Sequence, residues 1–194
     1  MNEPVAVMYV FAGNNGSGKS TIRNLILDML GISVHIDPDA LARGMDAEHP
    51  ERRKVSAGKE AIKLARECIR QSRDFSIETT LAGGNAIRLM KYARENGFEI
   101  TMFYVGLSDY ELNIERVATR VKNGGHDIPT SDIIRRHTTS TQNLLSHLDI
   151  IDDLIVIDNT NATGEIVLRV EKSRVKHQSE FLPQWVENIK RQLK

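Results

Sequence analysis

The sequence feature that most constrains the fold is the octapeptide GNNGSGKS, residues 13–20. It matches the phosphate-binding pattern G-x-x-x-x-G-K-[ST] at every fixed position. Residues 5–11 before it read VAVMYVF, as expected of a strand buried on both faces, and residues 21–30 after it have a helical period. A strand, a glycine-rich loop and a helix in this order predict an α/β domain whose first loop binds phosphate.

The residue types of this loop suit a nucleoside triphosphate. Glycines allow successive backbone N–H groups to curl round a phosphate, because a Cβ atom would block the approach. Lys19 is placed to reach the β- and γ-phosphates, and the Ser20 hydroxyl to ligate magnesium. An ordinary strand-to-helix turn is the alternative, but it does not require this lysine and serine. We therefore expect ATP and Mg²⁺ as cofactors, held by Gly13, Asn14, Asn15, Gly16, Ser17, Gly18, Lys19, Ser20 and Thr21.

Along the rest of the chain, short apolar runs alternate with longer amphipathic segments, which is the pattern of a parallel sheet with crossover helices. A chain of 194 residues fits one domain, residues 1–194. We predict a three-layer α/β sandwich of the P-loop kinase type, with helices on both faces of a five-stranded, mostly parallel sheet. The strands are expected at residues 5–11, 33–36, 75–79, 99–107 and 153–158, with a candidate edge strand at 166–170 and a closing helix at 183–193.

The charge balance restricts the class of partner. Lys and Arg together total 26, as do Asp and Glu, so the chain lacks the basic excess typical of proteins that bind nucleic acid or anionic membranes. We therefore expect a small-molecule substrate, no nucleic acid and no membrane. The single cysteine, Cys68, excludes an internal disulfide, and no apolar run approaches about 18 residues. These features predict a soluble, cytoplasmic protein.

A P-loop occurs in kinases, GTPase switches and motor ATPases, so other residues must distinguish between them. Asp37-Pro38-Asp39 follows the second expected strand. Proline at a first helical position makes Asp37 a natural N-cap. Asp39 then lies in the first turn, where one interpretation is that it complements the helix dipole. The other is that it acts as a general base, because parallel strands bring their carboxyl ends to the same crevice.

The segment FSIETTLAGG, residues 75–84, places a carboxylate and two hydroxyls at the end of the third expected strand. Glu78 can position a substrate hydroxyl or hold a magnesium-bound water. Thr79 and Thr80 can contribute hydroxyls to the same substrate side. The alternative is that one of the two threonines merely caps the next helix.

Arginines gather around a glycine-containing loop at residues 116–137. Arg116 and Arg120 share a helix face, a glycine pair ends that helix, and Arg135 and Arg136 follow in the next one. A P-loop kinase needs cations that fold over the γ-phosphate as charge spreads in the transition state. We therefore expect a helix-loop-helix lid, although arginines on helices are more often solvated surface.

Taken together, these segments resemble the short bacterial zeta toxin family. The resemblance covers about residues 5–160 and rests on FAGNNGSGKST, IDPDALA, FSIETTLAGG, ERVATRVKNGGHDIP with IIRRH, and DDLIVIDNT. Members of that family resemble P-loop kinases with a lid, and the founding toxins phosphorylate the 3′-hydroxyl of UDP-N-acetylglucosamine. The resemblance implies an ATP-dependent kinase in which Asp39 is the catalytic base and the lid residues Arg120 and one of Arg135 and Arg136 contact the γ-phosphate.

By the same resemblance, Glu78 and Thr79 lie at the substrate side and Asn159 lies near the nucleotide base. The chain is shorter than the founding toxins. The resemblance therefore supports the fold and the ATP site more strongly than it supports the sugar substrate. The main alternative is an ATP-binding regulator that binds a partner protein, such as an antitoxin, with little turnover. Asp39 and the lid arginines favour the kinase, since a switch needs no base beside an acceptor cleft.

Overall fold

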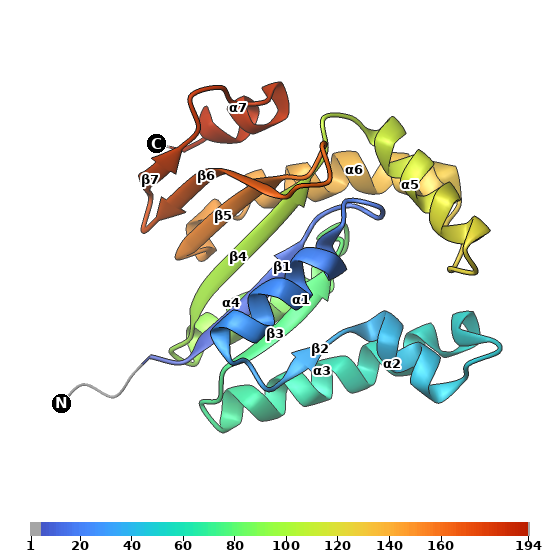
Figure 1. The fold of residues 1–194 in the computed structure, drawn as a ribbon. Helices are drawn as coiled ribbons and strands as arrows, with labels where there is room; N and C mark the ends of the chain where they lie inside the picture. The colour runs from blue at the N-terminus through green and yellow to red at the C-terminus, as the bar shows by residue number, and fades with distance from the viewer. Residues whose placement is uncertain (1–4, 194) are drawn as a thin grey trace.

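The computed structural model describes residues 5–193, which form one seven-stranded sheet with helices on both faces (Figure 1). The strand order is β2-β3-β1-β4-β5-β6-β7. The strands are β1 (Val7–Ala12), β2 (His35–Ile36), β3 (Phe75–Thr79), β4 (Glu99–Gly106), β5 (Asp153–Asp158), β6 (Glu165–Glu171) and β7 (Arg174–Gln178).

The longer connections along the chain are helical. The α-helices are α1 (Lys19–Leu30), α2 (Pro38–Met45), α3 (Lys54–Arg70), α4 (Gly84–Glu95), α5 (Tyr110–Lys122), α6 (Thr130–Leu145) and α7 (Gln184–Lys190). Short 3₁₀ turns lie at Pro50–Arg53 and Leu148–Ile150. None of the helices within residues 5–193 is long and apolar enough to cross a membrane.

The predicted α/β class is confirmed, and the five expected strands are parallel to one another. Apolar side chains build a core on each side of the sheet. On one face, α3, α4, α6 and α7 cover residues such as Met8 and Met102. On the other, α1 contributes Ile22 to a smaller cluster in which the rings of Phe11 and Phe103 stack at 5.0 Å. The sheet is therefore the middle layer of the predicted three.

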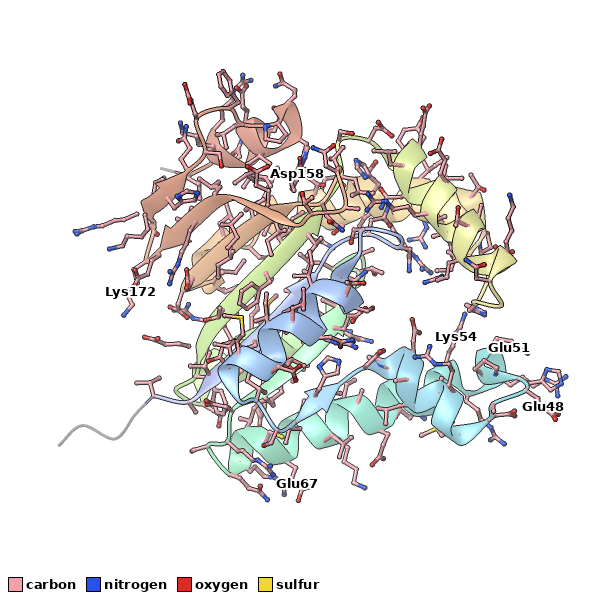
Figure 2. The ribbon with its side chains drawn as sticks, viewed as in Figure 1. Glu48, Glu51, Lys54, Glu67, Asp158 and Lys172 are labelled. Atoms are coloured by element: carbon pink, nitrogen blue, oxygen red, sulfur yellow. The ribbon has the colours of Figure 1, made fainter. Side chains whose placement is uncertain are left out.

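The predicted strand count was too low, because the sheet continues through an antiparallel hairpin. The candidate edge strand is present as β6, antiparallel to β5, and β7 pairs with β6 at the sheet edge. The sequence RVKHQ of β7 is exposed throughout, so it lacks the apolar alternation of a half-buried strand. Lys172 and Ser173 form the hairpin turn with φ of 46° and 64°, without the glycine or asparagine that marks such turns (Figure 2).

Candidate active site

The P-loop leaves β1 and enters α1 in a conformation that glycine alone permits at two inner positions. Gly16 and Gly18 have φ of +77° and +90°. A Cβ atom at Gly16 would lie 2.5 Å from the Asn113 carbonyl oxygen, and one at Gly18 would lie 2.2 Å from Asn159 Nδ2. The loop therefore packs against neighbouring elements on its outer side while its backbone curls round a concave inner side.

The inner side of the loop fits an anionic ligand. Lys19 is 7% exposed and its Nζ donates to the Asn14 carbonyl at 3.0 Å. Burial lowers the pKa of Lys19, and Glu78 and Asp39 partly oppose that shift. The Ser17 hydroxyl is buried without a partner among the residues that the structure describes. A buried ammonium and an unpaired buried hydroxyl suit the oxygens of a nucleotide phosphate.

Hydrogen bonds tie the P-loop to α5 and α6, the two helices of the expected lid. Asn14 Nδ2 donates to the Ile133 carbonyl of α6 at 3.0 Å, and Asn113 Nδ2 of α5 donates to the Asn15 carbonyl at 2.8 Å. Sequence reasoning missed Asn113, which is 1% exposed and whose contact with the P-loop spans 98 positions. A buried asparagine inside an amphipathic helix was the only available signal. Asn159 also braces the loop, because its Nδ2 donates to the Ser17 carbonyl at 2.8 Å.

Glu78 lies beside the predicted metal ligand. Ser20 Oγ donates to Glu78 Oε1 at 3.0 Å, and the second carboxylate oxygen of Glu78 pairs with Arg23 of α1. Glu78 also lines the cavity described below. Glu78 can therefore serve either of the two roles that the sequence suggested, and its hydrogen bonds are with Ser20 and Arg23.

The start of α2 has the geometry that its sequence predicts. The Asp37 side chain caps the helix, since its Oδ1 accepts from the backbone N–H groups of Asp39 at 2.9 Å and Ala40 at 3.2 Å. The N-cap prediction for Asp37 is confirmed. Asp39 is exposed, and none of the hydrogen bonds or ion pairs found within residues 5–193 uses its carboxylate. Asp39 is one of the residues that line the cavity described below.

The threonine pair does not cap the next helix, so that alternative is wrong. The N-cap of α4 is Gly83, with no side-chain hydrogen bond. Thr79 instead accepts from the backbone N–H of Leu81 at 2.9 Å, and it stabilises a turn in which Leu81 has a φ of +56°. Thr79 and Thr80 both line the cavity.

The arginines of the expected lid differ in their contacts. Arg136 reaches the P-loop, because its Nη1 donates to Asn15 Oδ1 at 2.9 Å. Arg135 is 57% exposed and pairs with Asp132 at 2.9 Å. Hydrogen bonding from Arg135, followed by the charge of Arg136, lowers the pKa of Asp132. Arg120 donates to the His126 carbonyl at 2.8 Å and so holds the loop between α5 and α6.

One cavity of about 530 Å³ brings most of these side chains together. It lies between the P-loop, the carboxyl ends of β2 and β3, the starts of α2 and α4, one face of α3, and the loop between α5 and α6. The α3 residues Lys54, Gly58, Ala61 and Ile62 follow the spacing of a single helix face. Figure 2 shows Lys54 at the start of α3, on the side that faces the lid loop.

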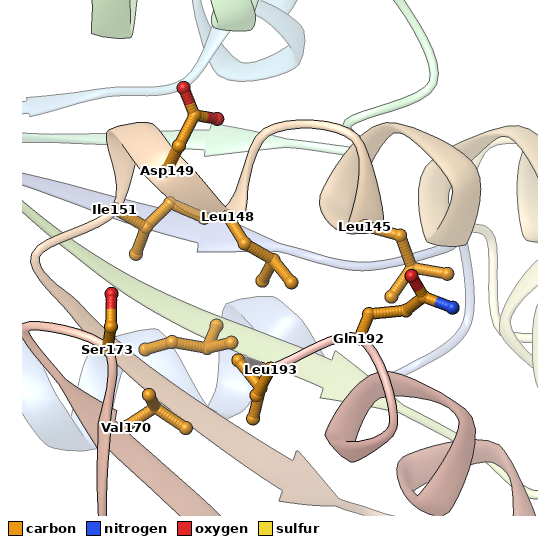
Figure 3. A pocket seen from close by; sticks show the side chains of 9 residues that line it. Leu145, Leu148, Asp149, Ile151, Val170, Ser173, Gln192 and Leu193 are labelled. Carbon is orange, nitrogen blue, oxygen red and sulfur yellow. The ribbon is translucent and has the colours of Figure 1, made fainter.

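A second cavity of about 290 Å³ lies on the far side of the sheet from α1, next to the end of α6 (Figure 3). Its walls are mostly aliphatic, from residues such as Leu145, Leu148 and Leu193. It contains none of the residues predicted for the site. The larger cavity is therefore the candidate active site.

Comparison with known proteins decides the family. The sequence model of the zeta toxin family matches residues 2–166. The chain belongs to the zeta toxin family. The family expected from the sequence motifs is thereby confirmed. An uncharacterised protein of Haemophilus influenzae is 39% identical over 125 residues, which make up 64% of this zeta toxin family chain and 87% of the relative.

Solved structures share the fold of this zeta toxin family member. A chain of the PezAT chromosomal toxin-antitoxin system of Streptococcus pneumoniae matches with a TM-score of 0.67 and 17% identity, covering 100% of this chain and 88% of that chain. The AvrRxo1-ORF1:-ORF2 structure with ATP matches with a TM-score of 0.68 and 12% identity, covering 98% of this chain and 64% of that chain. A putative kinase from Chloroflexus aurantiacus has a TM-score of 0.59 and 13% identity, with 100% of both chains covered. At these identities the likeness establishes the P-loop kinase fold alone.

Proposed function

We propose that this protein transfers the γ-phosphoryl group of ATP to a hydroxyl group of a small molecule. One observation carries the proposal: the same cavity is lined by Lys19 of the P-loop, by Asp39 and by Arg136 of the expected lid. A nucleotide switch needs the phosphate site but no base beside an open acceptor space. A kinase needs all three groups.

The cofactor-binding residues have separate tasks in this proposal. ATP, held by the P-loop, supplies the phosphoryl group. Bound Mg²⁺ would be ligated by Ser20 and would neutralise phosphate charge, and Lys19 contributes a buried positive charge at the same place. Glu78 orients the Ser20 hydroxyl by accepting its hydrogen bond. Asn159 keeps the loop in shape from behind, and a contact between Asn159 and the nucleotide base remains a prediction.

The remaining residues act on the acceptor and on the transition state. Asp39 accepts the proton of the attacking hydroxyl, and its carboxylate has no competing donor among residues 5–193. Arg136 is the lid arginine best placed to stabilise the transferring group, because it already contacts Asn15 of the P-loop. Arg120 holds the lid loop through the His126 carbonyl and is proposed to approach the γ-phosphate as that loop closes.

The acceptor occupies the part of the cavity between α3, the start of α4 and the lid loop. Thr79, Thr80 and Asn85 offer polar groups there, beside the small side chains of α3. The family makes UDP-N-acetylglucosamine the first acceptor to test. Purified protein is incubated with ATP, Mg²⁺ and a panel of nucleotide sugars, free sugars and other alcohols, and products are identified by mass spectrometry. We expect one hydroxyl compound to gain a phosphoryl group, and Lys19→Ala to abolish the product.

A second function, inhibition by a protein partner, is supported by the related structures. PezAT is a toxin-antitoxin system, and the AvrRxo1-ORF1 structure contains a second protein, AvrRxo1-ORF2. We propose that an antitoxin-like protein can cover the cavity of this chain. If no acceptor is phosphorylated while a partner binds only the ATP-loaded form, the regulator becomes the better interpretation.

A further inference from the structure

Three potential metal ligands meet where β2 and β3 end. The ligand atoms of His35, Asp37 and Glu78 all lie within 4.8 Å of one another, and all three residues are half-buried. One imidazole and two carboxylates form a donor set that divalent cations accept. In this structure a side chain, Arg23, supplies positive charge beside the three ligands. The Arg23 guanidinium forms an ion pair with Glu78, and its Nη1 lies 3.6 Å from Asp37 Oδ2.

Arg23 is held firmly in this position. Its side chain is 13% exposed, and its Nε and Nη2 donate to Asn24 Oδ1 at 3.2 and 2.9 Å. Burial, followed by the charge of Arg23, lowers the pKa of His35 to about 4, so the imidazole is neutral near pH 7. The contacts with the two carboxylates place the guanidinium as the cation of this cluster, since its Nη1 pairs with Glu78 and lies 3.6 Å from Asp37 Oδ2.

Glu78 connects Arg23 to Ser20, the P-loop residue expected to ligate magnesium. A carboxylate only accepts hydrogen bonds, so the proton of the Ser20 hydroxyl points at Glu78 Oε1, 3.0 Å away. The lone pairs of the hydroxyl oxygen are thereby left for magnesium. Arg23 fixes the other oxygen of the same carboxylate and so fixes the direction of this hydrogen bond.

Asp37 connects Arg23 to the first turn of α2, which carries the proposed general base Asp39. One of its carboxylate oxygens faces Arg23, and the other caps α2 by accepting from the Asp39 backbone N–H at 2.9 Å. The position of the first turn of α2, and with it the Asp39 carboxylate, depends on the side-chain conformation of Asp37. Arg23 stabilises that conformation.

We propose that Arg23 is a positioning residue and a built-in cation. It occupies the place that a divalent ion would take among His35, Asp37 and Glu78, and it joins the residue that orients Ser20 to the residue that caps the helix carrying Asp39. The effect on turnover rests on the proposed kinase function, whereas the cation role does not. Losing a group that orients a metal ligand typically lowers activity about 10- to 100-fold.

The first test compares Arg23→Met, which removes the charge, with Arg23→Lys, which keeps it. ADP release from ATP is measured with water and with UDP-N-acetylglucosamine as acceptor probes. We expect Arg23→Met to lower kcat about 10- to 100-fold with little change in the KM for ATP, and Arg23→Lys to recover part of the loss. Arg70→Met, at the exposed end of α3, makes the same chemical change away from the cavity and should retain wild-type kcat.

Three outcomes of this first test would overturn the proposal. They are wild-type kcat in Arg23→Met, equal losses in the Met and Lys variants, and an Arg23→Met chain that does not fold by circular dichroism. The last outcome would make Arg23 a residue for stability rather than for positioning.

The second test needs no turnover, so it separates this inference from the proposed function. Without nucleotide, Arg23→Met should bind one more Mn²⁺ than wild type, as measured by electron paramagnetic resonance, because the imidazole and carboxylates are then free to ligate it. Adding His35→Ala to Arg23→Met should remove the extra site. Equal Mn²⁺ binding by wild type and Arg23→Met would refute the built-in cation. A wild-type protein that releases no ADP while the Mn²⁺ results hold would refute the kinase function alone.

Discussion

A glycine inside α3 tests where the acceptor binds. Gly58 lies within the 17-residue helix and lines the active-site cavity, and a Cβ atom added there would meet nothing within 4 Å. Glycine in a helix interior is about 0.8–1 kcal/mol less favourable than alanine, and leucine is nearly as favourable as alanine. The helix would therefore be more stable with another residue, and we infer that the missing side chain leaves room for the acceptor.

Gly58→Leu should raise stability and lower activity together. A gain of about 1 kcal/mol corresponds to a rise in Tm of roughly 2–4 °C for a domain of this size. The isobutyl group would project into the acceptor part of the cavity and displace the reacting hydroxyl, and a misplacement of about 1 Å can cost on the order of 100-fold in rate. The KM for the acceptor should rise and kcat should fall, while ATP affinity stays at the wild-type value because the P-loop is untouched.

The assay combines thermal unfolding, ATP titration and turnover of the acceptor found in the screen. Gly44→Leu is the matched control: Gly44 lies in α2, its added Cβ also meets nothing within 4 Å, and it does not line the cavity. It should leave turnover unchanged. Full turnover in Gly58→Leu would show that the acceptor does not bind against α3. A lowered Tm would show that α3 has no room for a side chain at position 58.

Three further variants test the individual roles. Lys19→Ala should abolish phosphotransfer and weaken ATP binding without lowering Tm, because it removes a buried charge; unchanged activity would refute the ATP site. Asp39→Asn should lower phosphotransfer about 10²- to 10⁴-fold with ATP affinity retained, whereas a lower Tm with normal turnover would return Asp39 to a helix-dipole role. Arg136→Ala and Arg120→Ala should each lower kcat on the order of 10³-fold, and Arg135→Ala much less, since Arg135 is mostly exposed; equal, full turnover in all three would refute the lid.

The parts that the sequence predicted correctly are those with strong local signals. The P-loop is specified within eight consecutive residues, and the Asp37 cap within four. The parallel strands are short buried runs, so each is visible without knowledge of its neighbours. The second strand of the terminal hairpin has neither a buried face nor a turn residue such as glycine at Lys172 and Ser173, and its existence depends on pairing with β6.

Contacts between distant segments were not predictable from the sequence. Arg23 lies in the amphipathic helix α1, where an arginine is normally solvated surface, and its two carboxylate partners are 14 and 55 positions away. The role of Asn113 was equally hard to predict, since its buried amide is explained only by its hydrogen bond to the Asn15 carbonyl. In both cases the residue type is ordinary, and the partner that gives it a role is supplied by the fold.

The same long-range contacts restrict how the site can close. Both helices of the expected lid are bonded to the P-loop through residues in their first turns, by Asn113 on α5 and by the Ile133 carbonyl on α6. A rigid rotation of the whole lid would break these buried hydrogen bonds and leave polar groups unpaired, which is costly. The connecting loop, residues 123–129, carries cavity-lining residues from His126 onward, and its Gly124 has a φ of +81°. Closure over a bound nucleotide is therefore expected in that loop, and Arg120, which holds its backbone, would move with it.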